Sequence, residues 1–220
     1  MIRAVISDFG GVLTVPLAEA FAASEAHTGV SPAQLGAAMA GAAQAHGSPP
    51  LWDLERGEMS EDEFLRRLED ELPDGASLRG FGAAWFKQLH PNEPMLELMR
   101  DIRARGLRTA ILTNNVREWD ALWRAKIPDL DAVFETVVDS AWVGMRKPEP
   151  EIYALTVERL DGVTAAECLF VDDLEVNCDG ARAAGMAAVR FRSTAQATAD
   201  VEAALAAPGP QLSEPIRSQQ

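Results

Sequence analysis

Four polar residues in this 220-residue chain have the side-chain types that phosphoryl transfer requires. Such a site uses a carboxylate as nucleophile or metal ligand, a hydroxyl group that holds phosphate oxygens, a cation, and a second carboxylate for a metal ion. Asp8, Thr113, Lys147 and Asp173 supply these groups. Because they are far apart in the sequence, the hypothesis depends on whether the fold brings them together.

Short runs of mainly apolar residues precede three of these four positions. Residues 4–6, 109–112 and 169–171 each form such a run and stop at polar residues, which is typical of a strand that leads into a loop. Residues 137–138 and 187–189 are weaker strand candidates. The sequence therefore predicts polar groups at the carboxyl ends of several strands.

Helical patterns lie between the predicted strands. Pro94 precedes apolar residues at a spacing of three, and Gly106 ends that pattern. Pro148 opens a second pattern of the same kind. Strands that alternate with helices predict an α/β fold, a doubly wound and mostly parallel sheet with helices on both faces. In such sheets the ligand lies at the carboxyl ends of the strands.

A different pattern occupies residues 15–87, where apolar residues recur at helical spacing without a strand-like run. Residues 60–63 predict a capping box, and the helix after it has an apolar face formed by Phe64, Leu65, Leu68 and Leu72. We interpret this stretch as a small helical domain inserted into a core of residues 1–14 and 88–207. The polar, proline-containing residues 208–220 predict a mobile tail.

Four segments, taken together, resemble motifs one to four of the haloacid dehalogenase-like superfamily of hydrolases. They are residues 8–13, 112–114, 146–148 and 170–173 with Asn177. The order of the motifs matches, and the helical insertion lies where that superfamily carries its type-one cap. The most similar subgroup contains bacterial sugar-phosphate phosphatases and the N-terminal phosphatase domain of soluble epoxide hydrolase. Residues 54–58 and 144–148 also resemble segments of that subgroup.

The resemblance implies hydrolysis of a small phosphorylated metabolite, for example a sugar phosphate. Asp8 would be the nucleophile and would form an aspartyl-phosphate. Asp8, the carbonyl group of Gly10 and Asp173 would hold Mg²⁺, with water completing an octahedral shell. The metal ion would be the cofactor of the reaction.

The resemblance also implies roles for the remaining motif residues. Thr113 and the backbone amide of Asn114 would bind phosphate oxygens. Lys147 would neutralise the nucleophile and the charge that develops on the phosphoryl group. Asp172 and Asn177 would lie behind these site residues and support them.

One position departs from the phosphatase pattern. The superfamily usually places an aspartate two residues after the nucleophile, where it protonates the leaving group, but this chain has Gly10 there. General acid–base assistance contributes about 10²- to 10⁴-fold. Three hypotheses therefore stay open: a phosphatase that finds its acid elsewhere or does not need one, a haloacid dehalogenase-type enzyme that attacks carbon, and a weakly catalytic regulatory protein that binds metal and phosphate.

Composition excludes other classes of function. The chain has 20 Lys and Arg against 34 Asp and Glu, a net charge of −14, so we expect no nucleic-acid partner. No apolar stretch approaches the length of a membrane span. The two cysteines, Cys168 and Cys178, fit reduced thiols, and we expect a cytoplasmic protein without a membrane partner. The oligomeric state is open.

Several further residues in or near the insertion could bind a ligand, yet they lack metal-ligand spacing. We interpret them as packing or surface residues: His27, His46, His90, Trp52, Glu55 and Trp85. The sequence does not indicate which side chains of the insertion recognise the substrate.

Overall fold

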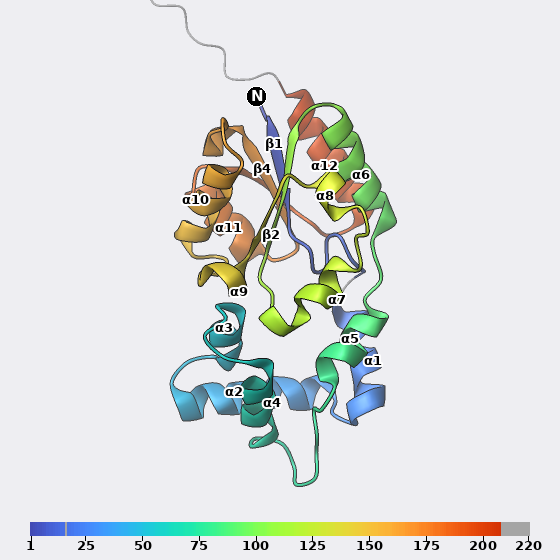
Figure 1. Ribbon diagram of the computed structural model, residues 1–220, viewed down its shortest axis with the longest axis vertical. Coiled ribbons are helices and arrows are strands. Elements are labelled where there is room, and N and C mark those ends of the chain that lie inside the picture. The colour runs from blue at the N-terminus through green and yellow to red at the C-terminus, as the bar shows by residue number, and fades with distance from the viewer. Residues whose placement is uncertain (16, 208–220) are drawn as a thin grey trace, which may run out of the picture.

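The structure of the protein is a computed structural model that describes residues 1–15 and 17–207 (Figure 1). Five parallel strands form one sheet in the order β3-β2-β1-β4-β5. The strands are β1 (Ala4–Ser7), β2 (Arg108–Thr113), β3 (Thr136–Asp139), β4 (Cys168–Asp172) and β5 (Ala187–Arg190). The predicted α/β fold is confirmed, and all five predicted apolar runs are strands.

Helices cover both faces of the sheet (Figure 1). They are α6 (Glu93–Ala104), α7 (Asp120–Arg124), α8 (Leu130–Val133), α9 (Ser140–Val143), α10 (Pro150–Arg159), α11 (Glu175–Ala183) and α12 (Thr194–Ala206). Two short 3₁₀ helices, η1 (Arg117–Trp119) and η2 (Ala165–Glu167), complete this part.

The central strand β1 shows why the sheet needs two helical layers. Its side chains alternate between the faces, and all four of its residues are buried. Val5 belongs to one apolar cluster with residues of α6 and α12, whereas Ile6 belongs to a second cluster with residues of α10 and α11. A continuous apolar run is therefore favoured here over an alternating one.

The strand register aligns the carboxyl ends of three neighbouring strands. Ser7 at the end of β1 pairs with Ile111 of β2 and with Val171 of β4. The residues that follow these positions therefore meet at one edge of the sheet, as expected for parallel strands.

A group of helices lies beyond this edge of the sheet (Figure 1). It consists of α1 (Leu17–Thr28), α2 (Pro32–His46), α3 (Pro50–Glu55), α4 (Glu61–Glu69) and α5 (Phe81–Gln88). The predicted apolar face is buried or half-buried, with Phe64, Leu65 and Leu68 in α4 and Leu72 just after that helix. Aromatic contacts join this helical group to the core, because Trp119 packs 5.5 Å from Trp85 and 5.3 Å from Phe86, measured between ring centroids.

The start of α4 differs in one detail from the prediction. The Ser60 hydroxyl accepts the Glu63 N–H at 3.2 Å, which is one half of a capping box. The Glu63 carboxylate instead accepts bonds from Arg66 and Arg67, each at 2.7 Å. Ion pairs one turn further along the helix therefore replace the reciprocal bond.

In the described ranges 1–15 and 17–207, no helix combines the length and apolar character needed to cross a bilayer. The predicted tail, residues 208–220, lies outside the described residues.

Candidate active site

Carboxylates from two neighbouring strands meet at the centre of the sheet edge. The Asp8 N–H donates to the Val171 carbonyl oxygen at 2.8 Å, which continues the pairing of β1 and β4 by one residue. Asp172 ends β4, and Asp173 follows it directly. The parallel pairing of the two strands thus delivers three carboxyl groups to one place.

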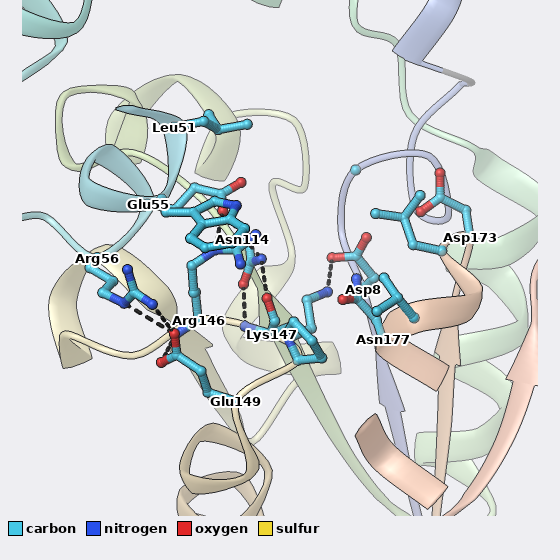
Figure 2. A pocket seen from close by; sticks show the side chains of 15 residues that line it. Asp8, Leu51, Glu55, Arg56, Asn114, Arg146, Lys147, Glu149, Asp173 and Asn177 are labelled. Carbon is cyan, nitrogen blue, oxygen red and sulfur yellow. Dashed lines mark hydrogen bonds and ion pairs between the residues drawn. The ribbon is translucent and has the colours of Figure 1, made fainter. Parts of the chain in front are cut away.

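Lys147 lies between two of these carboxylates, Asp8 and Asp172, and Figure 2 shows its contact with Asp8. Its Nζ is 2.8 Å from Asp8 Oδ1 and 2.6 Å from Asp172 Oδ2. Only 1% of the Lys147 side chain is exposed, and its Nζ also lies 5.4 Å from the centroid of the Phe170 ring. A buried ammonium group requires such partners, because its desolvation is otherwise costly.

Asp172 is held from behind by further hydrogen bonds. The Asn177 side-chain amide is 3.0 Å from Asp172 Oδ1 and 3.1 Å from Oδ2. The Leu174 N–H donates to Oδ1 at 2.8 Å. Both Asp172 oxygens are therefore engaged, so this carboxylate is oriented toward Lys147 and is a poorer candidate for a direct metal ligand than its neighbours.

The electrostatic balance of the cluster favours an additional cation. Burial raises the pKa of Asp8 to about 7, with Lys147 acting in the opposite direction and Asp172 and Asp173 adding to the rise. Burial lowers the pKa of Lys147, but Asp172 and Asp8 outweigh it and hold that pKa above its ordinary value. Three carboxyl groups thus face one ammonium group, which leaves negative charge for a metal ion to balance.

The geometry fits a hard divalent cation such as Mg²⁺. Asp8, Asp172 and Asp173 each place one carboxylate oxygen within 4.8 Å of the others. Gly11 leaves room for Asp173, because a Cβ atom at Gly11 would lie 2.7 Å from Asp173 Oδ2. Gly10 lines the same cavity as Asp8 and Asp173. Oxygen donors of this kind are the ligands that Mg²⁺ prefers.

Thr113 ends β2 and Asn114 follows it, but the two side chains have different surroundings. Thr113 is buried, and its hydroxyl has a long contact of 3.5 Å with the Asn114 carbonyl oxygen. The Asn114 side chain holds the backbone of Lys147: its Oδ1 accepts the Lys147 N–H at 2.8 Å, and its Nδ2 donates to the Lys147 carbonyl at 3.1 Å. Asn114 also lines the cavity, whereas Thr113 does not.

The cluster opens into a cavity of about 650 Å³ between the core and the helical group. Core residues Asp8, Gly10, Asn114, Lys147 and Asp173 form its inner wall. The helical group contributes the outer wall through Leu51, Trp52, Glu55 and Arg56. The predicted residues Asp8, Gly10, Asn114, Lys147, Asp173 and Asn177 thus share one cavity, with Asp172 and Thr113 behind its surface.

Two ion pairs at this cavity were not predicted from the sequence. Glu55 Oε2 accepts the Arg146 Nε–H at 2.6 Å, and Arg56 Nε donates to Glu149 Oε1 at 3.1 Å (Figure 2). The interpretation of Glu55 as a packing or surface residue was incomplete, because it lines the cavity. Burial raises the pKa of Glu55, although Arg146 opposes this shift. The opposite charges within residues 55–56 and within residues 146–149 are the sequence feature from which these two ion pairs could have been predicted.

A second, apolar cavity of about 190 Å³ adjoins the first. Leu51, Glu55 and Asn114 line both cavities. The remaining walls come largely from apolar and aromatic side chains of the helical group, including Met39, Phe64, Leu68 and Trp85. The space next to the carboxylate cluster therefore has a polar part and an apolar part.

Comparison with known proteins agrees with this geometry. The family of haloacid dehalogenase-like hydrolases matches residues 2–185. The chain therefore belongs to this family of hydrolases, and the resemblance found in its motifs is confirmed.

Individual relatives show which enzymes of this family the chain is similar to. The chain is 36% identical over 131 residues to a phosphatase of Mycobacterium tuberculosis, a match that spans 57% of this chain and 58% of that one, less than two thirds of either. It is 30% identical over 199 residues to a sesquiterpene phosphatase of Aspergillus oryzae, spanning 84% and 87%. A solved family enzyme of Bacteroides thetaiotaomicron, in complex with magnesium and inorganic phosphate, superposes on this structure with a TM-score of 0.64. The match covers 87% of this chain and 95% of that one at 21% identity, which shows a common fold.

The Lys147 ion pairs predict a large effect on stability. Lys147→Met leaves two buried carboxylates without their cation, so we expect the free energy of unfolding to fall by about 3 kcal/mol in the presence of a chelator. Urea denaturation measures this change. The exposed Lys87 is the control, and Lys87→Met should change stability by less than about 0.5 kcal/mol. Equal denaturation midpoints for the two variants would contradict the importance of the buried pairs.

The close approach of Asp173 to Gly11 predicts a specific effect of a side chain at position 11 on the metal site. Gly11 and Gly29 have φ angles of 81° and 72°, so alanine at either position should cost about 1–2 kcal/mol of stability. Only at Gly11 would the new Cβ meet Asp173, since no atom lies within 4 Å of a Cβ at Gly29. We expect Gly11→Ala, but not Gly29→Ala, to weaken Mg²⁺ binding in calorimetry. Equal Mg²⁺ affinities would show that Asp173 does not depend on Gly11.

Proposed function

We propose that the chain hydrolyses a small phosphorylated metabolite in the presence of Mg²⁺, through an aspartyl-phosphate on Asp8. The observation that supports this most is the buried Lys147 ammonium, 2.8 Å from the Asp8 carboxylate at the inner wall of a cavity large enough for a metabolite. A carboxylate nucleophile beside a fixed cation suits attack on an anionic phosphoryl group. The phosphatase relatives support the same reaction class.

The proposed reaction has two steps. An Asp8 oxygen forms a bond to phosphorus while the bond from phosphorus to the ester oxygen breaks. The leaving oxygen takes its proton from a water molecule, because Gly10 offers no acid. Water then attacks the acyl-phosphate, which releases inorganic phosphate and regenerates Asp8. The Asn114 backbone amide would bind phosphate oxygens, and Lys147 balances their charge in both steps. The phosphate contact of Thr113 stays a prediction, because this residue is buried behind the cavity surface.

Asp8, the Gly10 carbonyl and Asp173 would hold the Mg²⁺ ion. When bound, it supplies positive charge next to the phosphoryl oxygens. Asp172 and Asn177 keep Lys147 in place, so that the nucleophile retains its cation. We further propose that α1–α5 act as the cap predicted for residues 15–87. Side chains of α3 and the adjacent Arg56 form the outer wall of the cavity and would separate the reacting atoms from bulk water.

Two substrate classes are compatible with the cavities. A sugar phosphate would occupy the larger cavity, where Glu55, Arg56 and Arg146 offer polar groups to its hydroxyls. The adjoining apolar cavity favours a second candidate, a phosphate ester with a hydrocarbon body, and the similarity to a sesquiterpene phosphatase supports testing it. Dehalogenation is less favoured, because attack on carbon requires no metal ion and so does not account for the cluster of Asp8, Asp172 and Asp173.

A substrate screen tests the proposed function. We expect release of inorganic phosphate from at least one member of a panel of sugar phosphates and isoprenoid phosphates, with activity lost on addition of chelator and restored by Mg²⁺. Asp8→Asn should lower this activity by at least about 10⁴-fold, because the nucleophile is removed.

The same preparation separates the other hypotheses. Release of halide from 2-haloacids in the presence of chelator would favour a dehalogenase. Binding of Mg²⁺ and inorganic phosphate without turnover of any ester would favour the regulatory protein. Either result would contradict the proposed phosphatase.

The missing acid at position 10 predicts a dependence on the leaving group. Gly10 does not have a positive φ angle and lines the cavity, so an aspartate there can project toward the leaving oxygen. We expect Gly10→Asp to raise turnover of alkyl phosphates by about 10-fold or more, and that of anomeric phosphates much less, because an anomeric oxygen departs without full protonation. Steady-state kinetics on both esters measures this. Equal changes would count against this account.

A further inference from the structure

A half-buried ion pair connects the helical group to the segment that carries Lys147. Glu55 is the last residue of α3, and its Oε2 accepts the Arg146 Nε–H at 2.6 Å (Figure 2). The two side chains are only 13% and 14% exposed. Arg146 immediately precedes Lys147, so Glu55 fixes the chain one residue before the buried ammonium group.

The other side of Lys147 is fixed by Asn114, whose side-chain amide bonds to both the N–H and the carbonyl group of Lys147. The amide of Asn114 also faces Glu55, with 3.4 Å between Asn114 Nδ2 and Glu55 Oε2. One carboxylate oxygen of Glu55 therefore contacts both groups that hold the Lys147 backbone. A continuous series of contacts runs from α3 through Glu55 and Asn114 to Lys147 and on to Asp8.

The neighbouring ion pair does not have this property. Arg56 binds Glu149, and its hydrogen bonds reach neither Asn114 nor Lys147 among the described residues 1–15 and 17–207. Glu58, in the same short segment as Glu55, is exposed. Arg56 reaches the lysine segment only through Glu149, whose Oε2 accepts the Arg146 N–H at 3.1 Å. Of these three charged residues, Glu55 is the one that contacts Asn114, which holds the Lys147 backbone.

We propose that Glu55 is a positioning residue for Lys147, so that the correct placement of the ammonium group beside Asp8 depends on the seating of α3 against the core. This inference rests on the proposed function for its kinetic consequence. Glu55 acts by holding Arg146 and Asn114, and it transfers no proton to the substrate. Misplacement of a reacting group by about 1 Å can cost about 10²-fold in rate.

The main competing role for Glu55 is that of the general acid that Gly10 cannot supply. The two roles differ in their dependence on the leaving group. An acid matters for a poor leaving group such as an alkoxide and hardly matters for p-nitrophenolate. A positioning residue affects both substrates equally, because Lys147 balances the phosphoryl group whatever leaves.

The test compares Glu55→Ala, Glu55→Gln and the matched control Glu58→Ala, with p-nitrophenyl phosphate and an alkyl phosphate as substrates. We expect Glu55→Ala to lower kcat/KM by about 10- to 100-fold for both esters. Glu55→Gln keeps an acceptor oxygen for Asn114 and Arg146, so it should recover most of this loss. Glu58→Ala should remain within about twofold of the parent chain, as expected for an exposed residue.

Binding of inorganic phosphate gives a second readout that does not require turnover. Calorimetry in the presence of Mg²⁺ should show about 10-fold weaker phosphate binding for Glu55→Ala than for Glu58→Ala, because a hydrogen bond to a charged group is lost when Lys147 moves. Urea denaturation verifies that each variant is folded at the assay temperature. If the parent chain binds phosphate but hydrolyses neither ester, the proposed function fails while this comparison still tests the role of Glu55.

Two results would overturn the inference. Glu55→Gln could be as inactive as Glu55→Ala on the alkyl phosphate while both retain activity on p-nitrophenyl phosphate, which would identify Glu55 as the acid. Alternatively, Glu55→Ala could leave both kcat/KM and phosphate affinity unchanged, which would show that Lys147 is placed by the core alone.

Discussion

The site depends on a lysine that is buried and charged at the same time. Burial of the Lys147 ammonium group is tolerated because Asp8 and Asp172 lie 2.8 and 2.6 Å from its Nζ. This arrangement places a requirement on the rest of the core. Adjacent parallel strands must end in register, and the second carboxylate must be held by Asn177, since a small displacement of any member would leave a buried charge without its partner.

The same cluster suits the proposed binding of a phosphate ester by an acidic protein. The chain carries a net charge of −14, which repels a phosphate dianion at a distance. Within the cavity the charge balance depends on the nearby groups rather than on the net charge. One fixed ammonium group faces three carboxyl groups that can share a divalent ion. Binding of metal and binding of phosphate are therefore expected to depend on each other, because each neutralises charge that the other leaves.

The cavity belongs to two parts of the chain. The core supplies the groups of the carboxylate cluster, and the helical group supplies the outer wall and an adjoining apolar space. Ion pairs and aromatic contacts between them, such as Glu55 with Arg146 and Trp85 with Trp119, keep the wall in place. Under the proposed function, the recognition of a substrate and the placement of Lys147 would depend on the same contact surface.

The sequence by itself determined the sheet and the residues at its carboxyl edge. Apolar runs of strand length that end in polar groups have few other stable arrangements, and parallel strands bring those ends together. Only the tertiary structure decided that Asn114 holds Lys147 through its side chain and that Glu55 reaches Arg146, 91 positions away. Such contacts have no periodic signal, because they arise from how residues far apart in the sequence pack against each other.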